Sequence, residues 1–261
     1  MSHSISKTSF LKLEQCEKSF FLYKNHPCLR DKLSVDTQLT FKRGHHVGYF
    51  AQQLFPGGID VAKEAATSEK RIVLTKKLIE QKCQTIYEAT FLFNGVLIMI
   101  DILNLENEKY YAYEVKSSIR ISEIYLKDAC LQYYVLKNCL PGFEDLFLVN
   151  INSNYVLENE MDIKKLFIKK SLRKKAEENY LYIEHKVNSA HFILEKNSIP
   201  NISIGSHCFK PYSCDYMGSC WKNILTENSI FEMPFVSKTQ QFEWFEKGKK
   251  VISDLTEDDL L

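Results

Sequence analysis

Several features that would place this chain of 261 residues in a specialised class are scarce in its sequence. It has only 9 glycines and 6 prolines, which argues against a loop-dominated or low-complexity protein. Its 34 basic and 33 acidic side chains give a formal charge of +1, so any nucleic-acid site must be a local feature. With 45% hydrophobic and 26% charged residues, the chain has the composition and length of a globular protein with one large domain.

The sequence also lacks a long apolar run. Its most apolar stretch, residues 91–103, is about half the length of a membrane-spanning helix and contains Asn94 and Asp101. The N-terminal segment MSHSISKTSF includes no apolar stretch as long as that of a signal peptide. We therefore expect a soluble, cytoplasmic protein without a membrane partner.

Cysteine, in contrast, is abundant, with 8 residues. In a reducing compartment, clustered cysteines indicate a metal site rather than disulfides. Most of the cysteines are scattered among apolar residues, whereas Cys208, Cys214 and Cys220 lie together in a short stretch that also contains glycine, proline and serine. A four-coordinate site needs one more ligand, which Cys16 or His207 could supply.

The identity of the fourth ligand decides which metal group the cysteines suit. His207 would give a site for Zn²⁺, and Cys16 would give a four-cysteine site for an iron–sulfur cluster. The gaps between the C-terminal cysteines are longer than those common in zinc ribbons, which favours the cluster. A ligand at Cys16 would connect the two ends of the chain and restrict the unfolded state. Three free or buried thiols are the alternative.

Turn signals and hydrophobic periodicity predict helices, then three consecutive strands, then a helix and a strand. The predicted helices cover about 10–23, 44–55, 68–83 and 123–138, and the predicted strands cover 85–93, 96–103, 110–115 and 146–151. Asn94-Gly95 between the first two strands is a strong hairpin signal. A long helical stretch at 161–188, a cysteine-bearing loop at 200–221 and a short helix after residue 237 complete the pattern. This order predicts an α/β protein with a mixed sheet core flanked by helices.

Asp101, Glu114 and Lys116 are the strongest candidates for chemistry. Residues two apart on a strand share a face, so Glu114 and Lys116 should emerge together. Asp101 ends the apolar strand VLIMID, where a carboxylate needs a reason to be present. Two converging carboxylates can hold Mg²⁺ or Mn²⁺, and a neighbouring lysine can orient water and offset charge on a phosphate. A surface ion pair across two strands is the alternative.

The predicted helix at 123–138 could cover these strands with Asp128, Gln132, Tyr133 and Tyr134. Glutamine can bond a phosphate or a base, and tyrosine can stack on a base. Alternatively, the tyrosines belong to the core and the glutamine is exposed.

Two further patterns are weaker. The spacing Glu-x-Lys also occurs at Glu80/Lys82 and Glu184/Lys186, in predicted helices where the two side chains do not share a face. The basic segment KKLFIKKSLRKK at 164–175 could follow a phosphate backbone, although a solvated helix face is the simpler expectation.

Together these residues resemble the PD-(D/E)xK nuclease superfamily, RecB-like type. The order of an apolar strand ending in Asp, a Glu-x-Lys strand and a helical Gln/Tyr segment carries the resemblance. The cysteines around that core are similar to those of the iron–sulfur-staple branch, which includes the AddB nuclease domain and the exonucleases of CRISPR adaptation. A closer similarity, over about residues 6–255, is to an uncharacterised bacterial family of RecB-like nucleases, through SKTSFLKLEQC, FKRGHHVGYFAQQLFPGG, EATF, EVKSS, DACLQYYVL and GSHCFKPYSC.

The resemblance implies one restriction-endonuclease-like domain with an N-terminal helical part (1–84), a catalytic core (85–155), a helical and cysteine-cluster part (156–236) and a tail (237–261). It implies that Asp101, Glu114 and the carbonyl of Val115 bind Mg²⁺ or Mn²⁺. Lys116 would be catalytic, as would Gln132, and Gln132 and Tyr133 would contact the substrate. The cysteines that would hold a 4Fe-4S cluster, with Zn²⁺ as the alternative, are Cys16, Cys208, Cys214 and Cys220.

RecB-type enzymes usually also carry a metal-binding histidine four residues after a helix-starting glycine. Counted from Gly44, that position is Gly48 here, so His45, His46 or Glu88 would have to complete the site, unless the histidines are merely exposed. The implied function is a metal-dependent DNA nuclease, expected to be an exonuclease on single-stranded DNA or DNA ends. A partner domain or a repair or helicase protein is a further expectation. The alternative is a cluster- or zinc-bearing protein that binds DNA without cleaving it.

Overall fold

The computed structural model describes residues 5–32, 44, 46–196, 198–222, 224 and 226–260. The chain divides into two compact units. The sheet unit comprises residues 1–11 and 34–192, and the cysteine unit comprises residues 12–33 and 193–261. Of the four expected parts of the chain, the N-terminal part therefore contributes to both units. Within the described residues, no helix is both long enough and apolar enough to cross a membrane.

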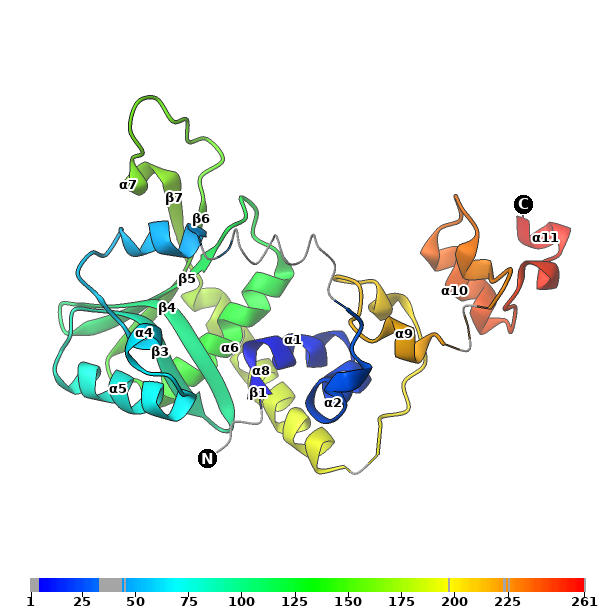
Figure 1. The fold of residues 1–261 in the computed structure, drawn as a ribbon, viewed down its shortest axis with the longest axis horizontal. Coiled ribbons are helices and arrows are strands. Elements are labelled where there is room, and N and C mark those ends of the chain that lie inside the picture. The colour runs from blue at the N-terminus through cyan, green and yellow to red at the C-terminus, as the bar shows by residue number, and fades with distance from the viewer. Residues whose placement is uncertain are drawn as a thin grey trace. The chain divides into compact units, whose positions relative to one another are not determined.

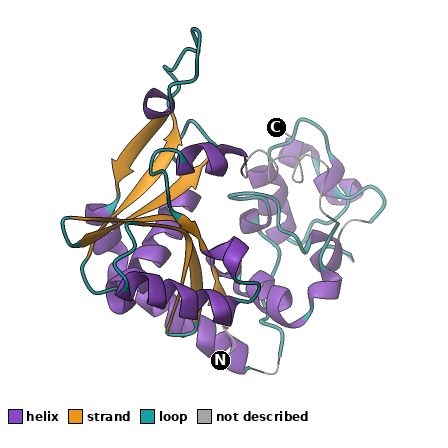
Figure 2. Ribbon diagram, turned by 60° about the vertical axis from the view of Figure 1, so that its left-hand side comes forward, coloured by secondary structure: helices purple, strands orange, loops and turns teal. Residues whose placement is uncertain are grey.

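The sheet unit contains a sheet of seven strands (Figures 1 and 2). The prediction of a mixed sheet is confirmed, although only four of these strands, β3 to β6, were predicted. Six strands follow the order β2-β3-β4-β5-β6-β7, and β1 pairs with β4. The strands are β1 (Ile5–Ser6), β2 (Ile59–Asp60), β3 (Thr85–Phe93), β4 (Val96–Glu106), β5 (Lys109–Lys116), β6 (Phe143–Ile151) and β7 (Phe167–Ser171). The three central strands are antiparallel, β6 runs parallel to β5, and β7 is antiparallel to β6.

Two tight hairpin turns define the register of the central strands. Asn94 and Gly95 join β3 to β4, and Asn107 and Glu108 join β4 to β5, all with positive φ. Two-residue turns of this kind match the twist of an antiparallel pair and fix which residues stand opposite each other. The predicted Asn94-Gly95 hairpin is therefore confirmed.

Strand β4 has a gap between its neighbours on one side. Strand β1 pairs with it at Val96 and Leu97, and β5 pairs with it only from Ile102 onward. Between these two pairings, side chains rather than a paired strand lie along this edge of β4. Asp101 lies at this gap, and Lys7, the first residue after β1, is the first residue of a helix beside it.

The helices of the sheet unit include α4 (Val61–Glu64), α5 (Ser68–Glu80), α6 (Glu123–Cys139), α7 (Ile163–Leu166) and α8 (Arg173–Glu195), of which the last continues past Phe192 into the cysteine unit. Residues 46–52 are helical as well, in agreement with the helix predicted to start near residue 44. The side chains of Thr67 and Ser122 cap α5 and α6, as their positions before apolar segments suggest. Helices α5 and α6 pack against β3.

The helix predicted at 161–188 is confirmed over residues 173–188 and is wrong as one continuous helix. The segment forms the short helix α7, the edge strand β7 and then α8 (Figure 1). Phe167 is buried against a cluster that includes Tyr113 and Val149, and the backbone of residues 167–171 pairs with β6. Pairing with the sheet edge thus outweighed the helical propensity of the lysines. A local sequence pattern does not indicate such a pairing.

The predicted helix at 10–23 is interrupted at Cys16. Helix α1 (Lys7–Gln15) ends before it, α2 (Glu17–Asn25) begins after it, and Cys16 has an extended backbone. The break places Cys16 at the N-terminus of α2.

The cysteine unit is built mainly from short elements around an aromatic core. These are α2, η1 (Pro27–Leu29), η2 (Ser206–Cys208), α9 (Met217–Cys220), η3 (Ile230–Glu232), α10 (Lys238–Glu246), η4 (Ile252–Asp254) and α11 (Glu257–Leu260). Trp221, Phe231, Phe242 and Trp244 pack with Cys208 in this core. The helix predicted after residue 237 corresponds to α10.

Candidate active site and cysteine pocket

Three carboxylates stand in one row across the central strands. The register of β3 and β4 places Glu88 opposite Asp101, between the pairs Tyr87/Ile102 and Ala89/Ile100. The register of β4 and β5, continued one residue beyond Ile102/Tyr113, places Asp101 opposite Glu114. Opposite residues in a sheet share a face, and like charges in such positions repel unless a cation compensates them. We call this set, Glu88, Asp101 and Glu114, the carboxylate row.

In the gap of β4, the side chain of Asp101 bonds to the backbone of β5 where a backbone–backbone hydrogen bond would otherwise form. Its Oδ2 accepts a hydrogen bond of 2.6 Å from the backbone N–H of Val115. Burial and the neighbouring carboxylate of Glu114 raise the pKa of Asp101 above its usual range. Lys7 and the Val115 N–H act in the opposite direction without cancelling this effect. The row therefore holds more negative charge than its surroundings compensate.

Glu114 is 2% exposed and lies between two lysines. The ammonium group of Lys116 is 2.7 Å from Glu114 Oε1, and that of Lys7 is 3.1 and 3.2 Å from its two oxygens. Burial raises the pKa of Glu114, but Lys116 and Lys7 outweigh it and hold the pKa below its usual value. Glu114 is thus a permanent carboxylate.

Helix α6 adds polar groups on the same face. Asp128 Oδ2 accepts a hydrogen bond of 2.7 Å from Lys116, and its Oδ1 accepts one of 3.3 Å from Gln132. Burial lowers the pKa of Lys116, but Glu114 and Asp128 raise it further, so the side chain stays an ammonium group. The ring of Tyr125 lies 5.2 Å from that ammonium nitrogen. Gln132 is fully buried, and its Oε1 has no partner among the described residues.

Lys7 was not identified as a site residue from the sequence. Its ammonium group also donates to the carbonyl of Met99 at 3.3 Å, so strand β4 helps to hold it. Burial would lower its pKa, but Glu114 and other carboxylates raise it, and the group stays charged. Identifying Lys7 would have required predicting the parallel pairing of β1 with β4, which joins positions about 90 residues apart.

Of the three candidates for completing a metal site, Glu88 is the one that lies in the carboxylate row. Burial raises the pKa of Glu88, Lys7 lowers it, and Asp60 and Glu114 raise it further. Its backbone has a φ of 54°, which is unusual for a residue with a side chain. His46 is exposed, and His45 lies outside the described residues.

The predicted substrate contact of Tyr133 has no support in the described contacts. Tyr133 is 2% exposed, packs edge-on against Phe143, and donates its hydroxyl to Glu177 at 3.1 Å. Tyr134 is equally buried and its hydroxyl meets Asn94. Both tyrosines thus follow the alternative that assigned them to the core, whereas Gln132 points to Asp128.

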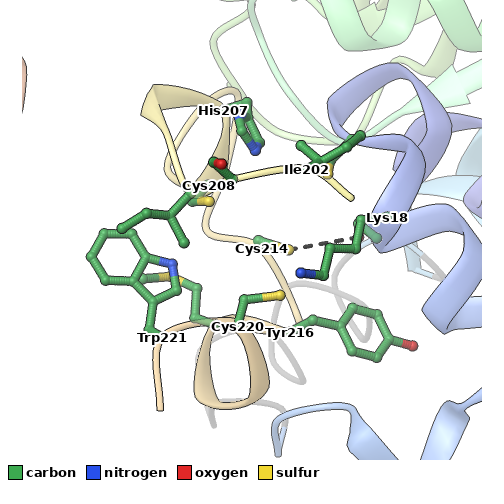
Figure 3. A pocket seen from close by; sticks show the side chains of 13 residues that line it. Lys18, Ile202, His207, Cys208, Cys214, Tyr216, Cys220 and Trp221 are labelled. Atoms are coloured by element: carbon green, nitrogen blue, oxygen red, sulfur yellow. Dashed lines mark hydrogen bonds between the residues drawn. The ribbon is translucent and has the colours of Figure 1, made fainter. Parts of the chain in front are cut away.

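In the cysteine unit, one pocket brings the four expected cysteines together. Cys16, Cys208, Cys214 and Cys220 all line it, with Lys18 and His207 also in its wall. Figure 3 shows Cys208, Cys214 and Cys220 around the pocket, with Lys18 opposite Cys220. All four cysteines are free thiols in this structure, and Cys214 Sγ lies 3.6 Å from Ser19 Oγ. We call this the cysteine pocket.

In the cysteine pocket, neighbouring groups offset only part of the effect of burial on the pKa values of the thiols. Burial raises the pKa of Cys16, although the N–H groups of Ser19 and Lys18 at the start of α2 lower it. Burial also raises the pKa of Cys220, Lys18 lowers it, and the other cysteines raise it. Burial lowers the pKa of His207, which favours the neutral ring that a metal ligand needs.

Residues of the N-terminal segment hold the cysteine-bearing loop. The amide of Gln15 donates to the carbonyls of His207 at 2.9 Å and Tyr212 at 2.7 Å. Lys12 and Arg30 form ion pairs of 2.9 and 2.7 Å with Asp215, next to Cys214. The carboxylate of Asp31 accepts from the N–H of Gly218 in α9, where a side chain would collide with it.

Across the described residues, no three His, Cys, Asp or Glu side chains are arranged so that they could hold a single metal ion. In the carboxylate row, the ammonium groups of Lys7 and Lys116 occupy the oxygens of Glu114. With Asp128, four carboxylates face these two ammonium groups, a net charge of −2 when all are ionised. The chemistry of these donors and their charge suit a divalent cation with a preference for oxygen, although the carboxylates do not surround one point in this structure.

No family model matches this chain, and no curated protein matches it.

Proposed function

We propose that this protein is a metal-dependent DNA nuclease of the PD-(D/E)xK, RecB-like type. The observation that carries the proposal is the carboxylate row, with the ion-paired Lys116 two residues from Glu114 on the same strand face. A restriction-endonuclease-like arrangement would account for the antiparallel β3, β4 and β5 with the parallel β6 beside them. We expect an exonuclease on single-stranded DNA or DNA ends.

Asp101, Glu114 and the carbonyl of Val115 would hold Mg²⁺ or Mn²⁺, and Glu88 would complete the set. Its position opposite Asp101 favours it over the exposed His46. When bound, the cation supplies Lewis-acid activation of water and neutralises charge on the phosphate. The raised pKa of Asp101 supports this assignment, because a cation beside it would restore the charged form.

Lys116 would act as a cation rather than as a base, since its ammonium form is stabilised by Glu114 and Asp128. From that position it would orient the attacking water and offset charge on the phosphate oxygens. In the hydrolysis, a water oxygen bonds to phosphorus, and one ester oxygen leaves with a proton. Asp128 holds Lys116, and Gln132 would offer its unpaired Oε1 to the hydroxyl or amino group of a nucleotide or to a bound water.

The basic segment offers a path for the phosphate backbone. The register places Lys170 beside Leu148, which stands beside Glu114. Lys170 therefore shares the face of the carboxylate row at a distance of two strands, roughly 10 Å. It is exposed. A lysine at this distance could contact a phosphate neighbouring the one that is cleaved.

The cysteine pocket would hold a 4Fe-4S cluster in a structural role. A single zinc ion draws its sulfur ligands to about 2.3 Å from one point. A four-iron cluster binds one cysteine at each iron, so its four ligands stand farther apart. Four cysteines that line one pocket would supply the four thiolates of such a cluster, and Zn²⁺ with His207 remains the alternative.

The test is cleavage of end-labelled single- and double-stranded DNA by anaerobically purified protein, with Mg²⁺, with Mn²⁺ or with a chelator. Lys116→Ala should lower the rate at least about 100-fold. The matched control is Lys82→Ala, which removes the lysine of another Glu-x-Lys spacing, an exposed residue paired with Glu108. It should cleave like the wild type.

Wild-type protein that binds DNA without cleaving it would contradict the nuclease proposal and support the DNA-binding alternative. Equal loss in both lysine variants would show that the effect is not specific to the carboxylate row.

A further inference from the structure

Trp221 carries a buried hydrogen-bond donor without an acceptor. The residue is 1% exposed, and its Nε1 has no partner among the described residues. An indole N–H can only donate, and leaving a buried donor unpaired is unfavourable. Such a donor in a wall of the cysteine pocket suggests that an acceptor belongs there.

The surrounding rings hold this donor in its orientation. Trp221 packs edge-on against Phe231, with centroids 4.8 Å apart, and against Phe209, with centroids 5.4 Å apart. Phe242 lies 6.0 Å away on another side. Figure 3 shows the indole nitrogen on the side of the ring that faces the pocket. Turning the ring toward another acceptor would break these aromatic contacts.

Sulfur atoms are the most numerous side-chain acceptors in the lining of the pocket, which also includes Ser19, Ser203 and His207. Four cysteines line it, and a metal group bound by them would carry thiolates and, in a cluster, inorganic sulfides. An ionised acceptor gives a stronger hydrogen bond than a neutral thiol. Hydrogen bonds to such sulfurs hold a metal group and change its reduction potential.

We propose that Trp221 is a positioning residue for the metal group of the cysteine pocket, donating its indole N–H to a sulfur of that group. This inference depends on the metal-binding part of the proposed function and not on DNA cleavage. Because a donated N–H stabilises extra negative charge on sulfur, Trp221 also favours the reduced form of a redox-active group.

The experiment uses the full chain, reconstituted anaerobically with ferrous iron and sulfide, or loaded with Zn²⁺ alone. Trp221→Phe removes the N–H and keeps an aromatic ring. The matched control is Trp244→Phe, because Trp244 is buried in the same aromatic core but does not line the pocket. Loss of the metal group to a chelator is followed by visible absorbance for the cluster and by a zinc-responsive dye for Zn²⁺.

We expect Trp221→Phe to release the group roughly 10-fold faster or more, as is common when a group that hydrogen-bonds to a metal ligand is removed. The reduction potential of the cluster should move to a more negative value. Trp244→Phe should match the wild type in both measurements. Since these two residues are the only tryptophans, binding should also quench the fluorescence of Trp244→Phe more than that of Trp221→Phe.

Replacing Trp221 by benzothienylalanine keeps the two-ring shape without the N–H, which separates the hydrogen bond from packing. Release and potential equal to wild type in that variant would overturn the inference, and so would failure of the wild type to bind iron or zinc. If DNA is not cleaved while the Trp221 effect is present, the nuclease proposal fails and this inference stands.

Discussion

Around Glu114, two ammonium groups compensate a buried carboxylate, whereas in the cysteine pocket the buried indole N–H of Trp221 has no acceptor among the described residues. The thiols of Cys16 and Cys220 in that pocket also have raised pKa values. We therefore expect the carboxylate row to keep its arrangement without a metal ion. We expect the cysteine pocket to depend on the group that it is proposed to bind.

The difference separates two uses of a metal. In the sheet unit, strand register, Lys7 and Lys116 position the carboxylates, so a cation would add chemistry to an arrangement already formed. In the cysteine unit, short elements and loops surround the pocket, so a metal group would add stability. We therefore expect metal removal to affect the two units unequally.

The largest expected effect comes from Cys214→Ser, which removes one of the four thiols. Apparent binding free energies of structural zinc sites are about 10–16 kcal/mol, so loss of the group should exceed any single side-chain effect on stability. The variant should be purified without metal and melt at a lower temperature than wild type, as measured by metal analysis and calorimetry.

The matched control for that variant is Cys28→Ser. Cys28 belongs to the same unit but is exposed and does not line the pocket. It should keep the metal and the melting temperature of the wild type. Equal losses in the two variants would contradict the distinction between ligating and free cysteines.

The next effect tests the carboxylate row in the metal-free protein. The raised pKa of Asp101 means that the folded state binds more protons there than the unfolded state, so this group lowers stability as pH rises from about 4. Asp101→Asn should therefore stabilise the metal-free protein by on the order of 2 kcal/mol at neutral pH and by less at pH 4. Denaturant unfolding at several pH values in a chelator measures this difference.

A stabilisation by Asp101→Asn that does not change with pH would show that the fold does not disfavour the ionised form of Asp101. The same variant should lose the stabilising effect of added Mn²⁺, since it lacks a ligand.

The smallest effect compares two lysine–carboxylate pairs of different burial. Lys7→Met leaves Glu114 with one cation and should cost about 1.5 kcal/mol at neutral pH. Lys82→Met breaks the exposed pair with Glu108, which solvent screens, and should cost less than Lys7→Met. Because the pKa of Glu114 is lowered, its contribution is present above its unfolded pKa and is lost as pH falls through the folded value.

The cost of Lys7→Met should accordingly shrink in acid, whereas that of Lys82→Met should stay small throughout. Equal costs at neutral pH would indicate that Lys7 contributes no more than a surface charge.

Much of the carboxylate row could have been derived from the sequence. A two-residue turn at Asn94-Gly95 places Glu88 opposite Asp101, and one at Asn107-Glu108 places Asp101 opposite Glu114. Only the first turn has a strong sequence signal, because Asn107-Glu108 lacks the usual glycine. The alternation of side chains along each strand then indicates which residues share a face.

The residues that sequence reasoning missed depend on contacts between distant segments. Lys7 reaches Glu114 only because β1 pairs with β4, and β7 exists only because the edge of β6 accepts it. The break of the first helix at Cys16 likewise has no strong local signal, since neither glycine nor proline marks it.

On this proposal, the sheet unit forms without its metal and the cysteine unit depends on one. Hydrogen exchange measured by mass spectrometry, on anaerobically purified protein before and after chelation, tests it directly. We expect chelation to increase exchange strongly in residues 12–33 and 193–222 and to leave β3 to β6 nearly unchanged. Equal increases in both units, or protection lost first in β4 and β5, would contradict this account.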